Sequence, residues 1–465
     1  MTTLAVTTVD LARAQFATTS LYHFLFVPLT LGLTPLVAIM QTAWYRTGVD
    51  AWLRLTKFFG ALLLINFAIG VATGLVQEFQ FGMNWSVYSA YVGGVFGAPL
   101  AIEGLAAFFL EATFLGLWIF GWDRLSARVH LATIWLVAIG TWLSAYFILV
   151  ANSWMQHPVG SKVVDGEAQL TNVWDLLTSR FALYAFTHTM FVGVTTGALV
   201  VLGVSCWHLA RGRNVDVFRR AAALALIVAV PATIGNMIVG SSFATASTDY
   251  QPMKIAAAEA LWNTEEPAAF SLFQIGGFSK DDQTPSFDIE VPHLLSILAT
   301  GTWGGKVEGL NQLQQQEQGQ FGPGNYMPPV EPAYWGMRVM AYTGGLMVLV
   351  ALVGAWLYRT KRLERARWFL WTAVVATAFP FIAAMAGWIL TEMGRQPWIV
   401  QGLLKTADAN SPNVSSTTLG ISLGVFFALY GTLAVVDVVL MRRFARLDPP
   451  SALPSDEPSV PAMSF

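Results

Sequence analysis

The sequence predicts an all-α integral membrane protein with nine transmembrane helices. Of its 465 residues, 55% are hydrophobic and only 12% are charged, whereas soluble domains carry about 25% charged residues. The hydrophobic residues gather in runs of about 20, the length that crosses the hydrocarbon core of a bilayer. The net charge is −2, which gives no reason to expect a nucleic-acid partner.

Nine apolar segments are long enough to span a bilayer. They are Tyr22–Thr42, Phe58–Glu78, Ala98–Gly121, Leu131–Ala151, Phe181–Cys206, Ala221–Gly240, Gly336–Tyr358, Phe369–Leu390 and Leu419–Met441. The N-terminus lacks the basic region and cleavage site of a signal peptide, so we expect the first segment to remain as a helix. The single cysteine, Cys206, lies in an apolar run and excludes an intramolecular disulfide.

The positions of the basic residues predict the orientation. With nine crossings, most of the 26 lysines and arginines fall in alternate loops on one side and at the C-terminal end. That side is cytoplasmic by the positive-inside rule, so the N-terminus lies outside and the C-terminus inside. The chain then divides into helices 1 to 6 (1–240), a long outer loop (241–335), helices 7 to 9 (336–441) and a cytoplasmic tail (442–465). Within the loop, the polar composition of Gln312–Gln320 predicts a mobile segment.

Ionisable residues within membrane spans are costly, so each one suggests a function. Glu103 and Glu111 are eight residues apart in the third segment, about 12 Å along a helix, and we expect both to face one bundle interior. Glu103 is also compatible with a plain interfacial residue at the outer start of that segment. Glu392 lies at the outer end of the eighth segment, where Gly394 and Pro397 are typical of a helix end but do not explain a carboxylate.

The predicted topology brings further polar residues to the same outer level. His23, His188 and Met340 begin the first, fifth and seventh segments, which all start outside. Each alone is more typical of a structural or core residue, but a histidine and a methionine together are the ligands of a six-coordinate, electron-transferring haem. Arg338 and Arg395 lie at this level too and are suited to pairing with haem propionates.

The sequence resembles subunit I of the cytochrome bd quinol oxidases from Gln15 through the ninth segment. The segments that carry the resemblance are Tyr22–Thr30, Gly82–Ser86, Gly97–Gly104, Phe108–Glu111, Gly121–Arg124, Ala151–Gln156 and Gly394–Trp398. The resemblance implies a terminal oxidase with three haems: a low-spin haem b, a high-spin haem b and a haem d.

The resemblance also implies roles for individual residues. His188 and Met340 are the expected axial ligands of the low-spin haem b, with Arg338 beside it. His23 and Glu392 are the expected ligands of the two high-spin haems, and which of them serves which haem is left open. Glu103 is expected to be a haem ligand or a proton donor, and Glu111 the next station of a proton path. Arg395 is expected to pair with a haem propionate.

The long outer loop resembles the Q-loop of this family in its shorter form. Lys254 and Glu259 match the lysine and glutamate implicated in quinol oxidation, Glu259 as acceptor of the quinol protons and Lys254 as a hydrogen-bond donor to the quinone. The quinol is menaquinol or ubiquinol. Protons leave to the outside, while those for reducing O2 to water come from the cytoplasm, which generates proton motive force without pumping. The implied partners are subunit II and small single-helix subunits, in a bacterial cytoplasmic membrane.

The main alternative is a membrane transporter or channel with a carboxylate proton relay. Such proteins place their sites near the bilayer midplane between internal repeats, whereas this sequence has no internal repeat and its polar set lies near one surface. A haem–copper oxidase needs more histidines within spans than His23 and His188. A haem b anchor subunit would leave His23 and Glu392 without a purpose.

Overall fold

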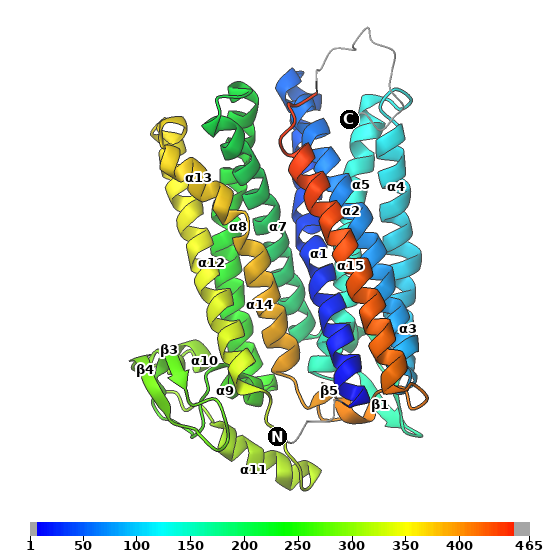
Figure 1. Ribbon diagram of the computed structural model, residues 1–465, viewed down its shortest axis with the longest axis vertical. Helices are drawn as coiled ribbons and strands as arrows, with labels where there is room; N and C mark the ends of the chain where they lie inside the picture. Colours follow the sequence, from blue (N-terminus) through cyan, green and yellow to red (C-terminus); the bar gives the residue numbers. More distant parts are fainter. Residues whose placement is uncertain (1–6, 451–465) are drawn as a thin grey trace.

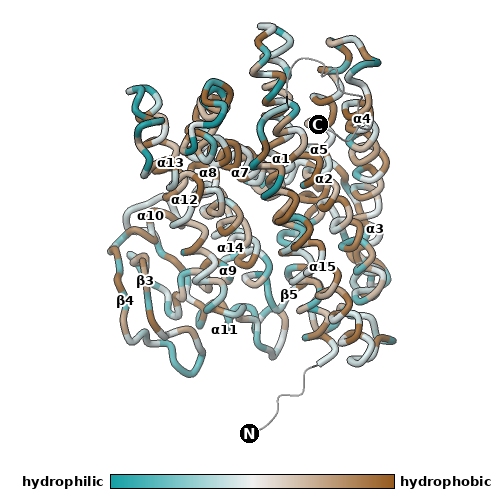
Figure 2. Tube along the Cα trace, turned by 45° about the horizontal axis from the view of Figure 1, so that its top comes forward, coloured by the Kyte–Doolittle hydropathy of each residue, from teal (hydrophilic) through white to brown (hydrophobic). Residues whose placement is uncertain are grey.

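The computed structural model of the protein describes residues 7–450. Within this range, nine helices are long and apolar enough to cross a membrane, at the nine predicted places. They are α1 (Thr8–Thr47), α2 (Asp50–Asn84), the continuous α3–η1–α4 (Ser86–Ile102, Glu103–Phe108, Phe109–Phe120), α5 (Ala127–Gln156), α6–α7 (Val173–Leu177, Arg180–Ala210), α8 (Val215–Tyr250), α12 (Val330–Arg359), α13–α14 (Arg367–Ala376, Phe379–Met393) and α15 (Ser416–Phe444). Hydrophobic residues occupy the middle of these helices and hydrophilic ones gather at their ends (Figure 2).

The transmembrane helices form two groups of four. The first comprises α1, α2, α3–η1–α4 and α5, and the second comprises α7, α8, α12 and α14, while α15 packs on the outside against α1 and α2 (Figure 1). In the second group, α8 and α14 each pack against both α7 and α12.

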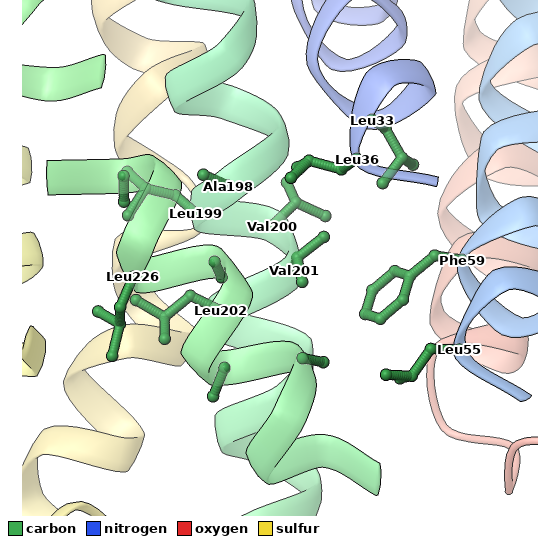
Figure 3. Close-up of a cluster of buried hydrophobic side chains, with 14 of the residues drawn as sticks. Leu33, Leu36, Leu55, Phe59, Ala198, Leu199, Val200, Val201, Leu202 and Leu226 are labelled. Atoms are coloured by element: carbon green, nitrogen blue, oxygen red, sulfur yellow. The ribbon is translucent and has the colours of Figure 1, made fainter. Parts of the chain in front are cut away.

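The two groups meet where α1 crosses α7, and glycines allow this close approach. A Cβ atom at Gly32 of α1 would collide with the backbone of Gly193 on α7, and one at Gly197 would collide with the backbone of Gly32. Small residues at a crossing let helix backbones approach closely within a membrane. One turn further along each helix, Leu36 of α1 and Val201 of α7 belong to one buried apolar cluster (Figure 3).

The connections at the end of the bundle where α1 begins are structured. The segment between α5 and α6 forms an antiparallel hairpin of β1 (Ser161–Val164) and β2 (Glu167–Leu170). The long loop contains α9 (Pro252–Ala258), the hairpin of β3 (Phe270–Gly276) and β4 (Pro285–Val291), α10 (Leu294–Thr300) and α11 (Leu310–Phe321). After α14 come β5 (Trp398–Val400), β6 (Leu404–Lys405) and the single turn η3 (Thr406–Asp408), and at the opposite end of the bundle η2 (Leu363–Arg365) precedes α13. Figure 1 shows α9, α11 and β3–β4 at the same end as the start of α1.

The prediction of a mobile segment at Gln312–Gln320 was wrong, because these residues form most of α11. Glutamine and glutamate are good helix formers. Leu310 and Leu313 are buried beneath them, and the Gln314 side chain accepts a hydrogen bond from the Tyr326 backbone N–H (2.9 Å). A polar composition therefore hid an amphipathic helix.

The structure also corrects the predicted depth of Glu103. The third transmembrane helix begins at Ser86 rather than near Ala98, so Glu103 lies near its middle and not at its end. Glu103 opens a π-helical turn, Glu103–Phe108, a feature found frequently at functional sites. At the other terminus α15 runs to Phe444, and the predicted tail continues to residues 451–465, which lie outside the described residues.

Candidate functional site

His188 lies two turns into α7 and faces α8. A Cβ atom at Gly240 of α8 would lie 3.1 Å from Cε1 of the imidazole, so this glycine makes room for the ring. Nδ1 of His188 is buried, and neither ring nitrogen has a hydrogen-bond partner among the described residues. A buried polar atom without a protein partner calls for an explanation, and a ligand or ion bound there is one.

Met340 lies on α12 of the same four-helix group, and its side chain faces a glycine on α14. A Cβ atom at Gly387 would lie 2.7 Å from the Met340 sulfur. The His188 and Met340 side chains therefore belong to one bundle, and each is accommodated by a glycine on a neighbouring helix. An imidazole and a thioether are the pair that holds a six-coordinate haem iron.

His23 lies in the other bundle, on α1. Its Nδ1 lies 2.9 Å from the hydroxyl of Thr73 on α2, and a Cβ atom at Gly74 would lie 3.1 Å from its Cε1. Its Nε2 makes no hydrogen bond to the described residues. A hydrogen bond to one ring nitrogen orients a histidine so that the other nitrogen can ligate a metal.

Glu392, at the end of α14, is held from two sides. The side-chain amide of Asn152 on α5 donates to its Oε1 (3.0 Å), and the Arg395 guanidinium donates to its Oε2. Arg395 is buried, yet its Nε and one terminal nitrogen have no partner among the described residues. A buried guanidinium with free donors fits an anionic group such as a propionate.

Lys254 on α9 points into this same cluster. Its ammonium donates to Oε1 of Gln156 on α5 (2.6 Å), and its chain packs so closely on Gly394 that a Cβ there would lie 2.6 Å from its Cγ. Burial lowers the pKa of Lys254 to about 7, and the nearby positive charge of Arg395 adds to this effect while Glu392 opposes it. A buried lysine with such a pKa is a candidate functional group.

Replacing Gln156 with leucine should remove the one side-chain acceptor that the buried Lys254 ammonium has within residues 7–450. An unsatisfied buried donor costs about 1–3 kcal/mol, so we expect a lower melting temperature and a higher KM for quinol, with a smaller effect on kcat. Thermal denaturation and steady-state kinetics of the complex measure both. Gln169→Leu, the same change at an exposed site of β2, is the control. An unchanged KM and melting temperature would show that Gln156 does not position Lys254.

Glu259 follows α9 and forms a buried ion pair with Arg338 of α12 at 2.6 Å. The same guanidinium also donates to the backbone oxygen of Ser271 on β3 (2.7 Å) and to that of Ala258, and it stacks on the Tyr334 ring at 3.8 Å. Burial raises the pKa of Glu259 to about 7, and the Arg338 charge limits this rise. The carboxyl can therefore exchange a proton near neutral pH.

The predicted residues of the long loop thus belong to two separate networks. Lys254 joins Glu392 and Arg395, while Glu259 joins Arg338. Most donors of Arg338 are already used by protein oxygens. The structure consequently brings Arg338 to the loop carboxylate rather than leaving it free for an anionic group, and its predicted role beside a haem stays a prediction.

Glu103 and Glu111 both face α5, as expected for two stations of one polar path. The hydroxyl of Ser144 donates to Glu103 (2.6 Å), and that of Thr141 donates to Glu111 (3.0 Å). Both carboxyl side chains are buried. Two buried carboxyls against neighbouring hydroxyls on one helix can pass a proton along the interior.

Sequence reasoning missed the residues that hold these groups. Asn152 and Gln156 were noted only as part of a motif, because their partners lie far away in the sequence. Asp437 on α15 was also missed, although an acidic residue in an apolar run is a visible signal. One of its carboxyl oxygens is buried without a partner among the described residues, as are the hydroxyls of Tyr22 and Tyr430, whose rings are in contact.

Comparison with known proteins agrees with these features. The family model described as cytochrome bd terminal oxidase subunit I matches residues 11–449. The chain is 45% identical to the cytochrome bd ubiquinol oxidase subunit 1 of Bacillus subtilis (93% of this chain, 92% of the relative) and 38% identical to the cytochrome bd-II ubiquinol oxidase subunit 1 of Escherichia coli (97% and 98%). The solved structure of the bd oxidase from Geobacillus thermodenitrificans matches with a TM-score of 0.85 at 28% identity, over 95% of this chain and 99% of that one. The chain therefore belongs to the cytochrome bd terminal oxidase subunit I family.

Proposed function

We propose that this chain oxidises quinol beside α9 and carries the haems at which dioxygen is reduced to water. As a member of its family it is a haem-containing quinol:oxygen oxidoreductase of a bacterial membrane. The observation that carries the assignment of the quinol site is the pair Lys254 and Glu259, which are both buried and both have a pKa near 7. Groups poised at this pKa suit the uptake and release of the protons of a quinol.

Ring nitrogens of His188 and His23 that have no partner among the described residues, and the free donors of Arg395, fit bound haems. We assign His188 and Met340 to a low-spin haem b, and His23 and Glu392 to a high-spin haem b and a haem d in an order that we leave open. Arg395 would hold a propionate with its free donors, and Glu103 is a possible further ligand. When bound, these haems carry electrons from quinol to dioxygen and bind the dioxygen.

The chain's own residues handle the protons. Glu259 accepts protons from the quinol while Lys254 donates a hydrogen bond to the quinone oxygen, and the protons leave at this end of the bundle. Glu111 and Glu103 supply protons from the opposite end. With the N-terminus outside and the C-terminus in the cytoplasm, this arrangement moves charge across the cytoplasmic membrane and generates proton motive force without a pump.

The proposal includes partners. Subunit II would complete the enzyme, with small single-helix subunits beside it, and α15 offers an almost entirely uncovered apolar helix to lipid or to such a partner. The substrate is menaquinol or ubiquinol.

The rate of quinol oxidation should depend on pH around neutrality. Because burial raises the pKa of Glu259 to about 7, the carboxyl is protonated below that pH and accepts protons only above it. Because the pKa of Lys254 is lowered to about 7, its ammonium is lost above that pH. We expect kcat/KM for quinol to be bell-shaped with a maximum near neutral pH, measured by oxygen consumption across the range. A flat profile would contradict both assignments.

A dithionite-reduced minus oxidised optical spectrum of the purified complex tests the haem assignment. Bands of haem b together with a long-wavelength band of a chlorin-type haem d are expected. If only haem b bands appear, both high-spin haems are haem b, and the assignment of quinol oxidation is unaffected. No haem in an intact, folded complex would overturn the proposal in favour of a transporter.

A further inference from the structure

The β3–β4 hairpin of the long loop exposes a set of large apolar side chains, although Phe270 at the start of β3 is buried. A strand pair at a protein surface normally buries its apolar side chains and exposes its polar ones. Here Ser271 and Gln274 of β3 are buried, while four large apolar side chains are exposed. The exposed fractions are 39% for Phe273, 53% for Ile275, 50% for Phe287 and 46% for Ile289. A contiguous exposed apolar patch marks a contact with a partner or a membrane.

The four side chains form one patch on one face of the hairpin. In the register of the two strands, Phe273 pairs with Ile289 and Ile275 pairs with Phe287. Paired residues lie on the same face, as do residues two apart within a regular stretch of strand. A register shift between Ser271 and Phe273 interrupts this alternation, so the buried Ser271 lies on the opposite face from the exposed Phe273. The rings of Phe273 and Phe287 lie 6.5 Å apart between centroids.

The opposite face is fixed to the protein. The backbone oxygen of Ser271 accepts from Arg338, and its hydroxyl lies 2.7 Å from that of Tyr334. The hairpin can therefore not rotate to bury its apolar face without breaking the hydrogen bonds of a buried arginine. The outward orientation of the patch is a built feature of the fold.

Contacts with α12 set the depth of the hairpin in the membrane. Residues 339–358 of α12 carry no charged side chain and match the length of about 20 residues that crosses the hydrocarbon core. Tyr342 lies within this stretch, close to its start, and its hydroxyl donates to the backbone oxygen of Leu272 on β3. The Phe273 ring contacts that of Trp335, one turn before the stretch (5.4 Å). Strand β3 therefore lies at the level where the hydrocarbon core begins.

The patch is also continuous with a surface that faces lipid. Val339, Tyr342 and Leu346 are exposed on α12 next to the hairpin, and Figure 1 shows β3–β4 at the side of the bundle beside the first turns of α12. The charged residues of the hairpin turn, Lys280, Asp281 and Asp282, lie outside the patch and are exposed. Tyrosine and tryptophan at this level are typical of a membrane interface.

We propose that the β3–β4 hairpin inserts its apolar face into the lipid leaflet at this end of the bundle. Phe273, Ile275, Phe287 and Ile289 contact lipid chains, while the charged turn stays in water. The proposal concerns how the long loop is anchored, and it does not depend on the assignment of the quinol site. Anchoring of the hairpin would also help to fix the position of Arg338, because β3 accepts hydrogen bonds from its guanidinium.

Site-directed labelling tests this insertion directly. The chain has one cysteine, Cys206, and it is buried, so a Cys206→Ala background accepts a single new thiol. Ile275→Cys and Phe287→Cys place an environment-sensitive fluorophore on the patch, and Asp281→Cys places it on the turn of the same hairpin. The complete complex is reconstituted in nanodiscs, and labelling of a complex without the new cysteine is subtracted. Unchanged haem spectra show that each variant is folded.

Two quenchers distinguish the possible surroundings of the patch. We expect lipids carrying a nitroxide on the acyl chain to quench the labels at 275 and 287 strongly, and aqueous iodide to quench them weakly. The label at 281 should show the reverse. Iodide quenching at 275 and 287 equal to that at 281 would overturn the proposal by placing the patch in water. Protection from both quenchers would also overturn it, because another protein surface would then cover the patch.

Discussion

Replacing Met340 with leucine should abolish the low-spin haem signal. Leucine keeps the volume of the side chain beside Gly387 but cannot ligate iron, so the six-coordinate state is lost while the bundle still packs. Changing a residue that only supports a ligand costs roughly 10- to 100-fold, so loss of a ligand should reduce quinol oxidation by more than about 100-fold. The reduced minus oxidised spectrum and oxygen consumption measure the two effects.

The matched control is Met347→Leu, at a buried methionine two turns further along α12. It makes the same chemical change without touching the proposed ligand, so both the spectrum and the rate should be retained. Retention of the low-spin signal in Met340→Leu would remove this residue from the ligand set. If both variants lose the low-spin haem signal equally, the loss reflects disturbed packing of α12 and not the removal of an iron ligand.

Replacing Glu259 with glutamine should slow quinol oxidation by about 10²- to 10⁴-fold, the contribution usual for a general base. The amide keeps the shape of the side chain and a hydrogen bond to Arg338 but cannot accept a proton. We expect the rising limb of the pH profile to disappear as well. Electron donors that carry no proton should still support oxygen consumption, because Glu259 touches none of the predicted haem ligands.

Glu265→Gln provides the comparison, since Glu265 lies six residues further along the same loop and is exposed. Its rate and pH profile should remain those of the unmodified enzyme. If Glu259→Gln retains both the rate and the rising limb, another group accepts the quinol protons. If oxidation of proton-free donors falls equally, the substitution acts on the haems rather than on the quinol.

The nine spans were predictable because an apolar run of bilayer length is a local property of the sequence. Their ends were not, because helix ends depend on caps and neighbours. Helix α1 begins fourteen residues before Tyr22, at a capping box in which Thr7 and Asp10 satisfy each other. The third helix begins at Ser86, directly after α2, so Glu103 lies near the middle of this helix and not at the expected end.

The identities of the site residues were predictable, but their partners were not. Histidines and carboxylates stand out within apolar runs, whereas the bond from Lys254 to Gln156 joins residues 98 apart and that from Arg338 to Glu259 joins residues 79 apart. The family resemblance implied that Arg338 lies beside the haem that Met340 ligates, and the two residues are only two apart in the sequence. On a helix, residues at this spacing face different directions, so Arg338 reaches α9 and β3 while Met340 faces α14.

The glycine crossing of α1 and α7 has a consequence for how this protein tolerates change. A methyl group at Gly32 or Gly197 would wedge apart the bundle that carries His23 and the bundle that carries His188. A mutational scan should therefore find these positions closed to every larger residue, while Gly420 on the outer surface of α15, where an added Cβ meets nothing, accepts many. The crossing fixes the distance between the two helix bundles. Substitutions are therefore expected to be tolerated mainly on the lipid-facing surface.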